Sequence, residues 1–237
     1  MKIIDVVQGE DIWHFERWGS ATGTRFQNAV GAKYSKANGW TVGNKDIQET
    51  LMLELISENR SRMEIDDYQS AEMMRGTALE PLSVKATCER FKIHLKAVGM
   101  LQSDLHKAFK FSPDAVYFNK DGVITGGFET KSKSGKKHIE YMLANELPKE
   151  HFWQCLCPMV MSENVKWWIF SHFDDRDMID PLFTITLKRA DHEELIAQCE
   201  TLIVEFLNEL DSRTIEMGGY YVDPLKAHYY KDRLTGE

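Results

Sequence analysis

Apolar and polar positions alternate most clearly between residues 111 and 138, where the chain reads FSPDAVYFNKDGVITGGFETKSKSGKKH. Two apolar runs, 115–118 and 123–128, flank a polar Asn-Lys-Asp-Gly segment of the kind that forms tight turns. The pattern therefore predicts a β-hairpin. Gly126 and Gly127 lie in its second strand and are free to absorb a register offset as a β-bulge.

The ends of this hairpin carry three charged side chains. Asp114 opens the first strand, and Glu129 and Lys131 close the second. Side chains alternate between the faces of a strand, so Glu129 and Lys131 should project on one side, about 7 Å apart. The turn brings Glu129 back toward Asp114. Two carboxylates beside an ammonium can hold a hard divalent cation next to a scissile phosphate, although an ordinary surface hairpin with a Glu–Lys pair fits the same residues.

Helical periodicity marks the segments on either side of the hairpin. The expected helices cover a short piece around residues 10–18, a second piece from Thr24, and residues 46–59, 77–91, 139–145, 149–161 and 191–217. Asp46, the Thr77–Glu80 capping box and Asp191 are the expected starts, and Pro158 should kink or shorten its helix.

Strand-forming sequence fills most of the remaining chain. Residues 91–111 predict one or two strands, and residues 166–173 and 183–187 predict two more. Residues 31–44 are expected to form a loop, and residues 60–69 a charged connection. No repeat or linker interrupts this order. The predicted fold class is α/β, with residues 1–237 forming a single domain whose central mixed β-sheet is flanked by helices.

Composition narrows the class of protein. The 237 residues are 43% hydrophobic, enough to bury a substantial core. No run of about 18 apolar residues is present, and acids interrupt the amino terminus, so neither a membrane span nor a secretory signal is expected. The four cysteines are scattered, and Cys155 and Cys157 are too close for the usual zinc pair, so reduced core thiols are expected.

The net charge of −8 argues against a passive coat on nucleic acid, which would normally be basic. An enzyme can still concentrate positive charge in one groove. Such a concentration directly follows the carboxylate pair and consists of Lys131, Lys133, Lys136, Lys137 and His138. A solvated loop is the other interpretation of this run.

Two further segments each have a functional and a structural interpretation. Small residues and hydroxyls around Thr24 can leave backbone N–H groups free to face an anion, and Arg17 and Arg25 can join them as a phosphate clamp. Simple N-capping by Thr22 or Thr24, with Trp13 and Trp18 in the core, is the structural interpretation. Glu80 can likewise serve either the capping box or a metal.

Five sequence elements, in this order, resemble the lambda exonuclease family, the YqaJ-like viral recombinases of the PD-(D/E)xK nuclease superfamily. They are QGEDIWHFERWG at 8–19, RGTALE at 75–80, SPD at 112–114, ETK at 129–131, and Gln154 in the helix after the basic run. The likeness covers most of the chain, and it implies a PD-(D/E)xK nuclease-like core.

The resemblance implies a role for each matching residue. Asp114, Glu129 and the Thr130 carbonyl would bind a metal ion, and Glu80 would bind a second one directly or through water. Lys131 would orient or deprotonate the attacking water. These residues and the supporting Gln154 are the expected catalytic set.

The resemblance also implies residues that bind DNA. Trp13, Arg17 and Thr24 align with the family's binding site for the 5′-terminal phosphate. The remaining expected contacts to the phosphate or the DNA backbone are Arg25, Lys133, Lys136 and Lys137.

By this resemblance the protein would be a Mg²⁺-dependent exonuclease, with Mn²⁺ as a substitute, that digests linear double-stranded DNA from a 5′ end and leaves 3′ overhangs for recombination. It would form a ring-shaped homotrimer and work with a single-strand annealing protein. A soluble cytoplasmic protein of a bacterial host, encoded by a phage or prophage, is expected. An endonuclease of the same superfamily and a non-catalytic DNA-binding scaffold are the alternatives.

Overall fold

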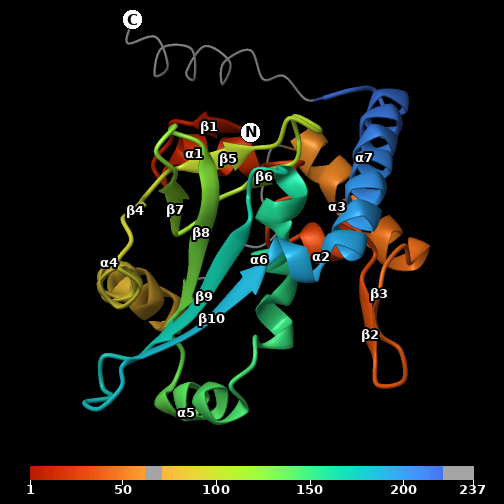
Figure 1. Ribbon diagram of the computed structural model, residues 1–237. Helices are drawn as coiled ribbons and strands as arrows, with labels where there is room; N and C mark the ends of the chain where they lie inside the picture. The colour runs from red at the N-terminus through yellow and green to blue at the C-terminus, as the bar shows by residue number, and fades with distance from the viewer. Residues whose placement is uncertain (62–70, 221–237) are drawn as a thin grey trace, which may run out of the picture.

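The computed structural model describes residues 1–61 and 71–220, and a five-stranded mixed sheet lies at its centre (Figure 1). The strand order is β10-β9-β8-β7-β4. Neighbouring strands are antiparallel except for β8 and β9, which run parallel and are connected through two helices. The strands of this sheet are β4 (Leu95–Lys96), β7 (Ala115–Phe118), β8 (Ile124–Lys131), β9 (Trp167–Phe173) and β10 (Leu182–Lys188).

Helices cover both faces of this sheet. The α4 helix contacts β8, β9 and β10, whereas α6 packs on β9 from the other face and also contacts α7 and α2. The α/β class with a mixed sheet flanked by helices is therefore confirmed. The helices are α1 (Asp11–Arg17), α2 (Phe26–Ala29), α3 (Lys45–Ser61), α4 (Ala71–Phe91), α5 (Gly135–Ala144), α6 (Lys149–Met161) and α7 (Glu193–Glu216), with a 3₁₀ turn, η1 (Arg189–Asp191), before α7.

Two small sheets complete the structure. One has the order β1-β5-β6, and the other pairs β2 with β3. The loop predicted for residues 31–44 is wrong in part, because β2 and β3 form a hairpin whose turn, residues 36–38, leads into Gly39 with a φ of +66°. Residues 91–111 give three short strands rather than one or two. The strands are β1 (Lys2–Ile4), β2 (Lys33–Ser35), β3 (Gly39–Thr41), β5 (Met100–Gln102) and β6 (Lys110–Phe111).

The helices predicted at 46–59 and from 191 are present, but other residues begin them. In α3 the Asn44 side chain accepts a hydrogen bond from the Ile47 N–H at 3.1 Å, so Asn44 is the cap and not Asp46. Asp191 ends η1, and α7 begins two residues later. Both predicted caps therefore lie within two residues of the true helix start, Asp46 just after it and Asp191 just before it.

Two prolines lie inside helices that were predicted to begin or end near them. The α4 helix begins at Ala71, so the Thr77–Glu80 segment lies in its interior, and Pro81 costs it one backbone hydrogen bond. The α6 helix continues past Pro158 to Met161. Packing of α6 on the sheet and on α7 offsets the lost bond there. The predicted 60–69 connection lies mostly outside the described residues.

The predicted hairpin is confirmed, with its bulge one residue earlier than expected. Tyr117 pairs with Gly126 and Phe118 pairs with Ile124, which leaves Thr125 as the extra residue. Gly126 and Gly127 are required by packing and do not form the bulge. A Cβ at Gly126 would lie 2.2 Å from the Trp167 ring, and the same clash would occur between Gly127 and its neighbour on β9. Glycine is needed at both positions because the Trp167 and Trp168 rings of β9 lie where a Cβ would be.

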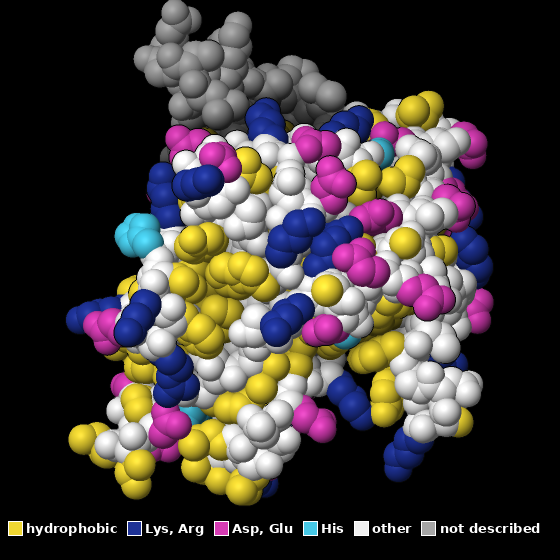
Figure 2. All heavy atoms as spheres, in the orientation of Figure 1, with side chains coloured by type: hydrophobic (Ala, Val, Ile, Leu, Met, Phe, Trp, Pro, Cys, Tyr) yellow, Lys and Arg dark blue, Asp and Glu magenta, His cyan; other side chains and the backbone are white. Residues whose placement is uncertain are grey.

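The core is apolar, and charges of both signs are distributed over the surface. Cys155, Cys157 and Cys199 are buried and free, as predicted for core thiols, whereas Cys88 is free but only partly buried. Figure 2 shows acidic and basic side chains interspersed on one face. Within the described ranges, no helix is both long and apolar enough to cross a membrane.

Candidate active site

The hairpin register brings Asp114 and Glu129 together. Ala115 pairs with Phe128, so the next antiparallel pair is Asp114 opposite Glu129, with both side chains on one face. The Thr130 N–H donates to Asp114 Oδ2 at 2.6 Å. One bend of the chain thus holds both acids at the same end of the sheet.

Glu129 is the most buried of these acids, with 1% of its surface exposed. Its Oε1 atom accepts hydrogen bonds from Lys131 Nζ and from Gln154 Nε2, both at 2.5 Å. Its Oε2 atom is buried and has no hydrogen-bond partner among the described residues. A buried carboxylate oxygen without a donor is costly, so this atom requires a further positive or polar group.

Burial raises the pKa of all three acids, and repulsion by Asp114 raises the pKa of Glu129 and Glu80 further. The pKa of Glu129 is raised to about 8, first by burial and then by Asp114. The pKa of Glu80 is raised to about 7 by burial and by Asp114. Burial also raises the pKa of Asp114, although Lys131 opposes this. Like charges crowded in a cleft are typical of a site that binds a cation.

Lys131 remains an ammonium group at neutral pH. Burial disfavours its charge, but Glu129 and Asp114 favour it more, and the pKa of Lys131 is raised above its ordinary value. Lys131 therefore neutralises part of the negative charge of the acids. It also presents a fixed positive charge beside them.

The donor set fits a small oxygen-preferring cation. Across residues 1–61 and 71–220, no group of three or more His, Cys, Asp and Glu side chains lies close enough to hold an ion by itself. Mg²⁺ takes few protein ligands and keeps several waters, so it does not need such a group. The unpartnered Glu129 Oε2, the adjacent Asp114 and the Thr130 carbonyl are oxygen donors of the right kind.

Glu80 reaches this site from α4, across a cleft of about 560 Å³. The cleft is lined by Glu80 and Asp114 together with Gln8 and Lys96. Gln8 Nε2 donates to the Pro113 carbonyl at 2.9 Å, directly before Asp114. The amino-terminal segment is therefore hydrogen-bonded to the start of the hairpin on the side of the cleft.

A ring of three buried hydroxyls fixes α4 against the sheet. Ser83 Oγ lies 2.7 Å from Thr130 Oγ1 and 3.0 Å from Ser171 Oγ, and Ser171 Oγ donates to Thr130 Oγ1 at 2.8 Å. Three hydroxyl hydrogens can satisfy these three contacts in one closed cycle. Ser83 lies three residues after Glu80, one helical turn away, so the ring sets the height of Glu80 along the sheet.

Ser83→Ala should lower the free energy of unfolding by about 2 kcal/mol, because it leaves two buried hydroxyls short of a partner. Thr87→Val is the matched control. Thr87 is also fully buried on α4, but its Oγ1 has no hydrogen-bond partner in the described part of the chain. Urea unfolding of both variants measures the difference. Equal losses in the two would show that the ring contributes nothing specific.

The amino-terminal residues predicted at the 5′-phosphate lie partly beside the hairpin. Trp13 Nε1 donates to Ser112 Oγ at 2.8 Å, and the Arg17 guanidinium lies over the Trp13 ring at 4.2 Å. Since Ser112 directly precedes Pro113 and Asp114, α1 is joined to the carboxylate site. Sequence reasoning missed Ser112, although it belongs to the SPD element itself.

Thr24 and Arg25 are placed differently. Thr24 is exposed, and its hydroxyl lies 3.3 Å from Thr22 Oγ1. Arg25 is held by Glu58, which is fully buried and accepts from Arg25 Nη1 at 2.9 Å. Glu58 also accepts from the Gly19 N–H at 3.0 Å. The guanidinium of Arg25 therefore already has a carboxylate partner in this structure.

The basic run is divided between the end of β8, a short connection at residues 132–134 and the first turns of α5. Ser134 caps α5 by accepting from the Lys137 N–H, so Lys136 and Lys137 lie in its first turn. Lys137 pairs with Glu140 at 3.0 Å, and Lys136 lies 3.7 Å from the same residue. These exposed pairs leave both ammonium groups at the surface.

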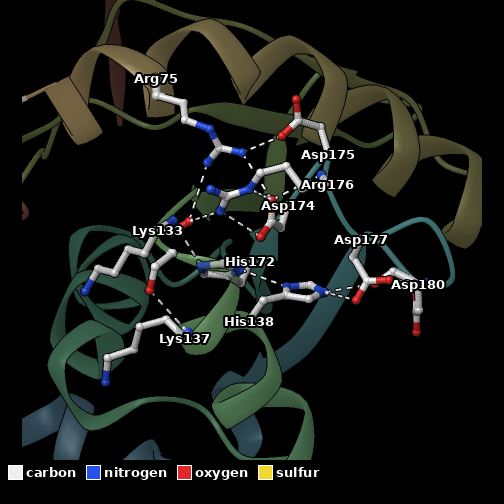
Figure 3. Close-up of polar contacts among 11 residues, drawn as sticks. Arg75, Lys133, Lys137, His138, His172, Asp174, Asp175, Arg176, Asp177 and Asp180 are labelled. Atoms are coloured by element: carbon white, nitrogen blue, oxygen red, sulfur yellow. Dashed lines mark hydrogen bonds and ion pairs between the residues drawn. The ribbon is translucent and has the colours of Figure 1, made fainter.

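The backbone at Lys133 is anchored by the polar cluster in Figure 3. Its N–H donates to His172 Nε2 at 3.0 Å, and its carbonyl accepts from Arg75 and Arg176 at 3.4 and 3.3 Å. His172 is bonded in turn to His138, 2.9 Å between Nδ1 atoms. The Lys133 and Lys137 side chains extend away from this cluster, so Arg75 of the RGTALE element orients the segment without using the lysines.

A mixed sheet with two carboxylates and a lysine at the end of one hairpin is the arrangement of a PD-(D/E)xK nuclease, an enzyme class that acts on DNA. The family model of the YqaJ-like viral recombinase domain matches residues 12–164. The chain belongs to this family. Among curated proteins, none matches the chain.

Solved structures agree with this assignment. LHK-Exo, an alkaline exonuclease from Laribacter hongkongensis, is 26% identical, with a TM-score of 0.68 over 88% of this chain and 96% of that one. The same protein in complex with dAMP gives 25% identity, a TM-score of 0.69 and the same coverage. A phage-related exonuclease from Haemophilus somnus 129PT shares only the fold, at 11% identity and a TM-score of 0.50 over 82% and 96% of the two chains.

Proposed function

We propose that this protein is a Mg²⁺-dependent 5′-to-3′ exonuclease that digests linear double-stranded DNA and leaves 3′ single-stranded overhangs for recombination by single-strand annealing. The observation that carries the proposal is the buried Glu129 carboxylate, held by Lys131 and Gln154 with one oxygen unpartnered beside Asp114. The exonuclease relatives and the recombinase family support it.

In this proposal Asp114, Glu129 and the Thr130 carbonyl hold Mg²⁺, or Mn²⁺ in its place, and Glu80 contributes to a second ion. A bound ion would act as a Lewis acid and lower the pKa of a coordinated water. Gln154 fixes the orientation of Glu129. Burial of the Glu129 side chain keeps bulk water from competing for its oxygens.

Lys131 acts as an electrostatic stabiliser rather than as a general base. The neighbouring carboxylates of Glu129 and Asp114 raise the pKa of Lys131, which favours its protonated form in the metal-free protein and supports this role. Its ammonium group lies 2.5 Å from Glu129, next to the position of the scissile phosphate in this proposal. There it offsets charge that develops on the phosphate oxygens.

DNA binding is divided between two regions in this proposal. Trp13, Arg17 and Thr24 bind the 5′-terminal phosphate, together with Ser112, which Trp13 contacts. Arg25 supports this site while it is bonded to Glu58. The lysines that contact the DNA backbone are Lys133, Lys136 and Lys137.

We also propose the assembly that the family resemblance implies. Residues 1–237 would form one nuclease domain, and three copies would form a ring around the duplex. A single-strand annealing protein would receive the 3′ overhang. The expected location is the cytoplasm of a bacterial host that carries the phage or prophage.

The decisive experiment compares linear duplex DNA with closed circular DNA in the presence of Mg²⁺. Wild-type protein should degrade the linear form from its 5′ ends and leave circles intact, while Lys131→Ala should lose this activity. End-labelled substrates give the polarity. Cleavage of circles at the same rate would instead favour an endonuclease, and no cleavage of either form would favour a scaffold.

Without metal ions, the free energy of unfolding should fall on the order of 2 kcal/mol between about pH 6.5 and 8. The raised pKa values of Glu129 and Glu80 mean that the folded state binds more protons than the unfolded state in this range, so rising pH destabilises it. The histidines whose pKa is lowered, such as His151, titrate mainly below this range. Thermal unfolding in a chelating buffer tests this, and Glu129→Gln should flatten the dependence.

A further inference from the structure

One carboxylate oxygen near the active site is surrounded by donors from three different segments. Glu150 Oε1 accepts from Lys133 Nζ at 2.6 Å and from the Tyr141 hydroxyl at 2.6 Å. His151 Nε2 lies 3.4 Å from the same oxygen. Lys133 follows β8, Tyr141 belongs to α5, and His151 belongs to α6. Their convergence on a single oxygen defines a small anion site.

The donors are mostly buried, whereas the carboxylate is not. Tyr141 and His151 each have 7% of their surface exposed, but half of the Glu150 side chain is exposed. His151 Nε2 is buried and makes no hydrogen bond of acceptable geometry among the described residues. If the Glu150 carboxylate moves out into solvent, the Tyr141 hydroxyl, the His151 Nε2 atom and the Lys133 ammonium group are left facing the position that its oxygen occupied. Such a set requires another anion.

The electrostatics favour an anion at this position. Hydrogen bonds from Lys133 and then from Tyr141 lower the pKa of Glu150 to about 2. Burial, with Lys131 and Lys133 nearby, lowers the pKa of His151 to about 3. His151 is therefore a neutral imidazole and can donate from Nε2 in one tautomer. Around the Glu150 oxygen, the site therefore offers one positive charge, from Lys133, and two neutral donors, Tyr141 and His151.

The site lies close to the acids that would cleave DNA. Glu150 and Gln154 are four residues apart on α6, which places their Cβ atoms about 6 Å from each other. Gln154 in turn donates to Glu129. A DNA strand carries one phosphate for each 3.4 Å or so of helix axis. Lys133 follows Lys131 by two residues, so a strand that is cut at Glu129 would present a neighbouring phosphate on the Lys133 side of the site.

We propose that Lys133, Tyr141 and His151 form a binding subsite for a DNA-backbone phosphate next to the scissile one, and that the Glu150 carboxylate occupies this subsite until DNA displaces it. This subsite rests on the proposed nuclease function and extends it to a particular phosphate contact. Glu150 thus competes with DNA for this subsite and occupies it when no DNA is bound.

The test is the affinity of the full-length protein for a labelled linear duplex, measured by fluorescence anisotropy in a chelating buffer that prevents cleavage. Glu150→Gln removes the competing charge, so affinity at low salt should rise about fivefold, and the slope of log affinity against log salt should steepen by about 0.9. Glu146→Gln is the matched control, because it removes the same charge from the exposed connection between α5 and α6.

A second variant tests the buried donor directly. In the Glu150→Gln background, Tyr141→Phe should weaken duplex binding about tenfold, because it removes a hydrogen bond to a charged oxygen. If Glu150 only stabilises the start of α6, then Glu150→Gln will match Glu146→Gln and Tyr141→Phe will not change affinity. Either of these results overturns the subsite.

Inorganic phosphate distinguishes a site for DNA from a site for free anions. If calorimetry shows phosphate binding to the Glu150→Gln protein but duplex affinity is unchanged, the assignment to DNA is overturned. Cleavage assays on wild-type protein separate the two proposals. A wild type that digests linear duplex, with Glu150→Gln no different from its control, refutes the subsite alone. A wild type that neither binds nor digests duplex refutes the nuclease function.

Discussion

Glu129→Gln should reduce the cleavage of linear duplex DNA by a thousandfold or so while leaving the fold intact. The amide has the same shape as the carboxylate, and its oxygen can still accept the bonds from Lys131 and Gln154 at the Oε1 position. Its NH₂ group replaces Oε2, which has no hydrogen-bond partner in the described residues. The variant therefore keeps the shape of the side chain but loses the charge that pairs with Lys131 and an oxygen that can hold a cation.

Rates on linear duplex with saturating Mg²⁺ measure this effect, and calorimetry with Mn²⁺ should show weaker ion binding. Glu163→Gln, at an exposed position after α6, is a control that should retain full activity. Cleavage at the wild-type rate by the Glu129→Gln protein would remove Glu129 from the reaction. Because its carboxylate is the centre of the proposed site, that outcome would also refute the proposed mechanism.

Glu58→Ala should lower the free energy of unfolding by about 3–5 kcal/mol. This is the largest loss of stability expected from replacing one buried polar side chain. Glu58 is fully buried and accepts from both Arg25 and the Gly19 N–H. Truncation leaves the partly buried Arg25 guanidinium without its carboxylate, and it leaves an N–H group without an acceptor. Breaking such a pair costs far more than an exposed ion pair contributes.

Urea unfolding measures this loss, and Glu54→Ala, at an exposed position of the same helix, should stay within about 0.5 kcal/mol of wild type. Replacing both partners, in Arg25→Gln with Glu58→Gln, should recover part of the stability, because no buried charge is then unpaired. A loss below about 1 kcal/mol for Glu58→Ala would mean that water compensates the pair. Arg25 would then be available for a phosphate.

The local sequence was enough to predict the elements whose signals are short in range. The hairpin at 115–131 follows from two apolar runs and a turn sequence, and its register puts Asp114 opposite Glu129. The helices at 45–61 and 193–216 follow from long apolar stripes. Strand alternation also predicted that Lys131 and Glu129 point to the same side of the strand. The 2.5 Å hydrogen bond between Lys131 Nζ and Glu129 Oε1 confirms this.

Features that depend on partners far apart in sequence were not predictable. The Ser83, Thr130 and Ser171 ring joins positions 47 and 88 residues apart, and Arg25 meets Glu58 over 33 residues. A serine inside a helix or a single glutamate has no local signal for its partner. The start of α4 was also missed, because packing on β8, β9 and β10 holds the helix together despite Pro81.

What the sequence alone determined is therefore the class of fold and the hairpin with its three charged residues, because turn chemistry and side-chain alternation act over a few residues. Tertiary packing alone decided how deeply Glu129 is buried, which of its oxygens is left without a donor, and which lysines are paired with acids. Those properties depend on desolvation by distant elements, and desolvation is what raises the pKa of Glu129 and prepares it for a cation.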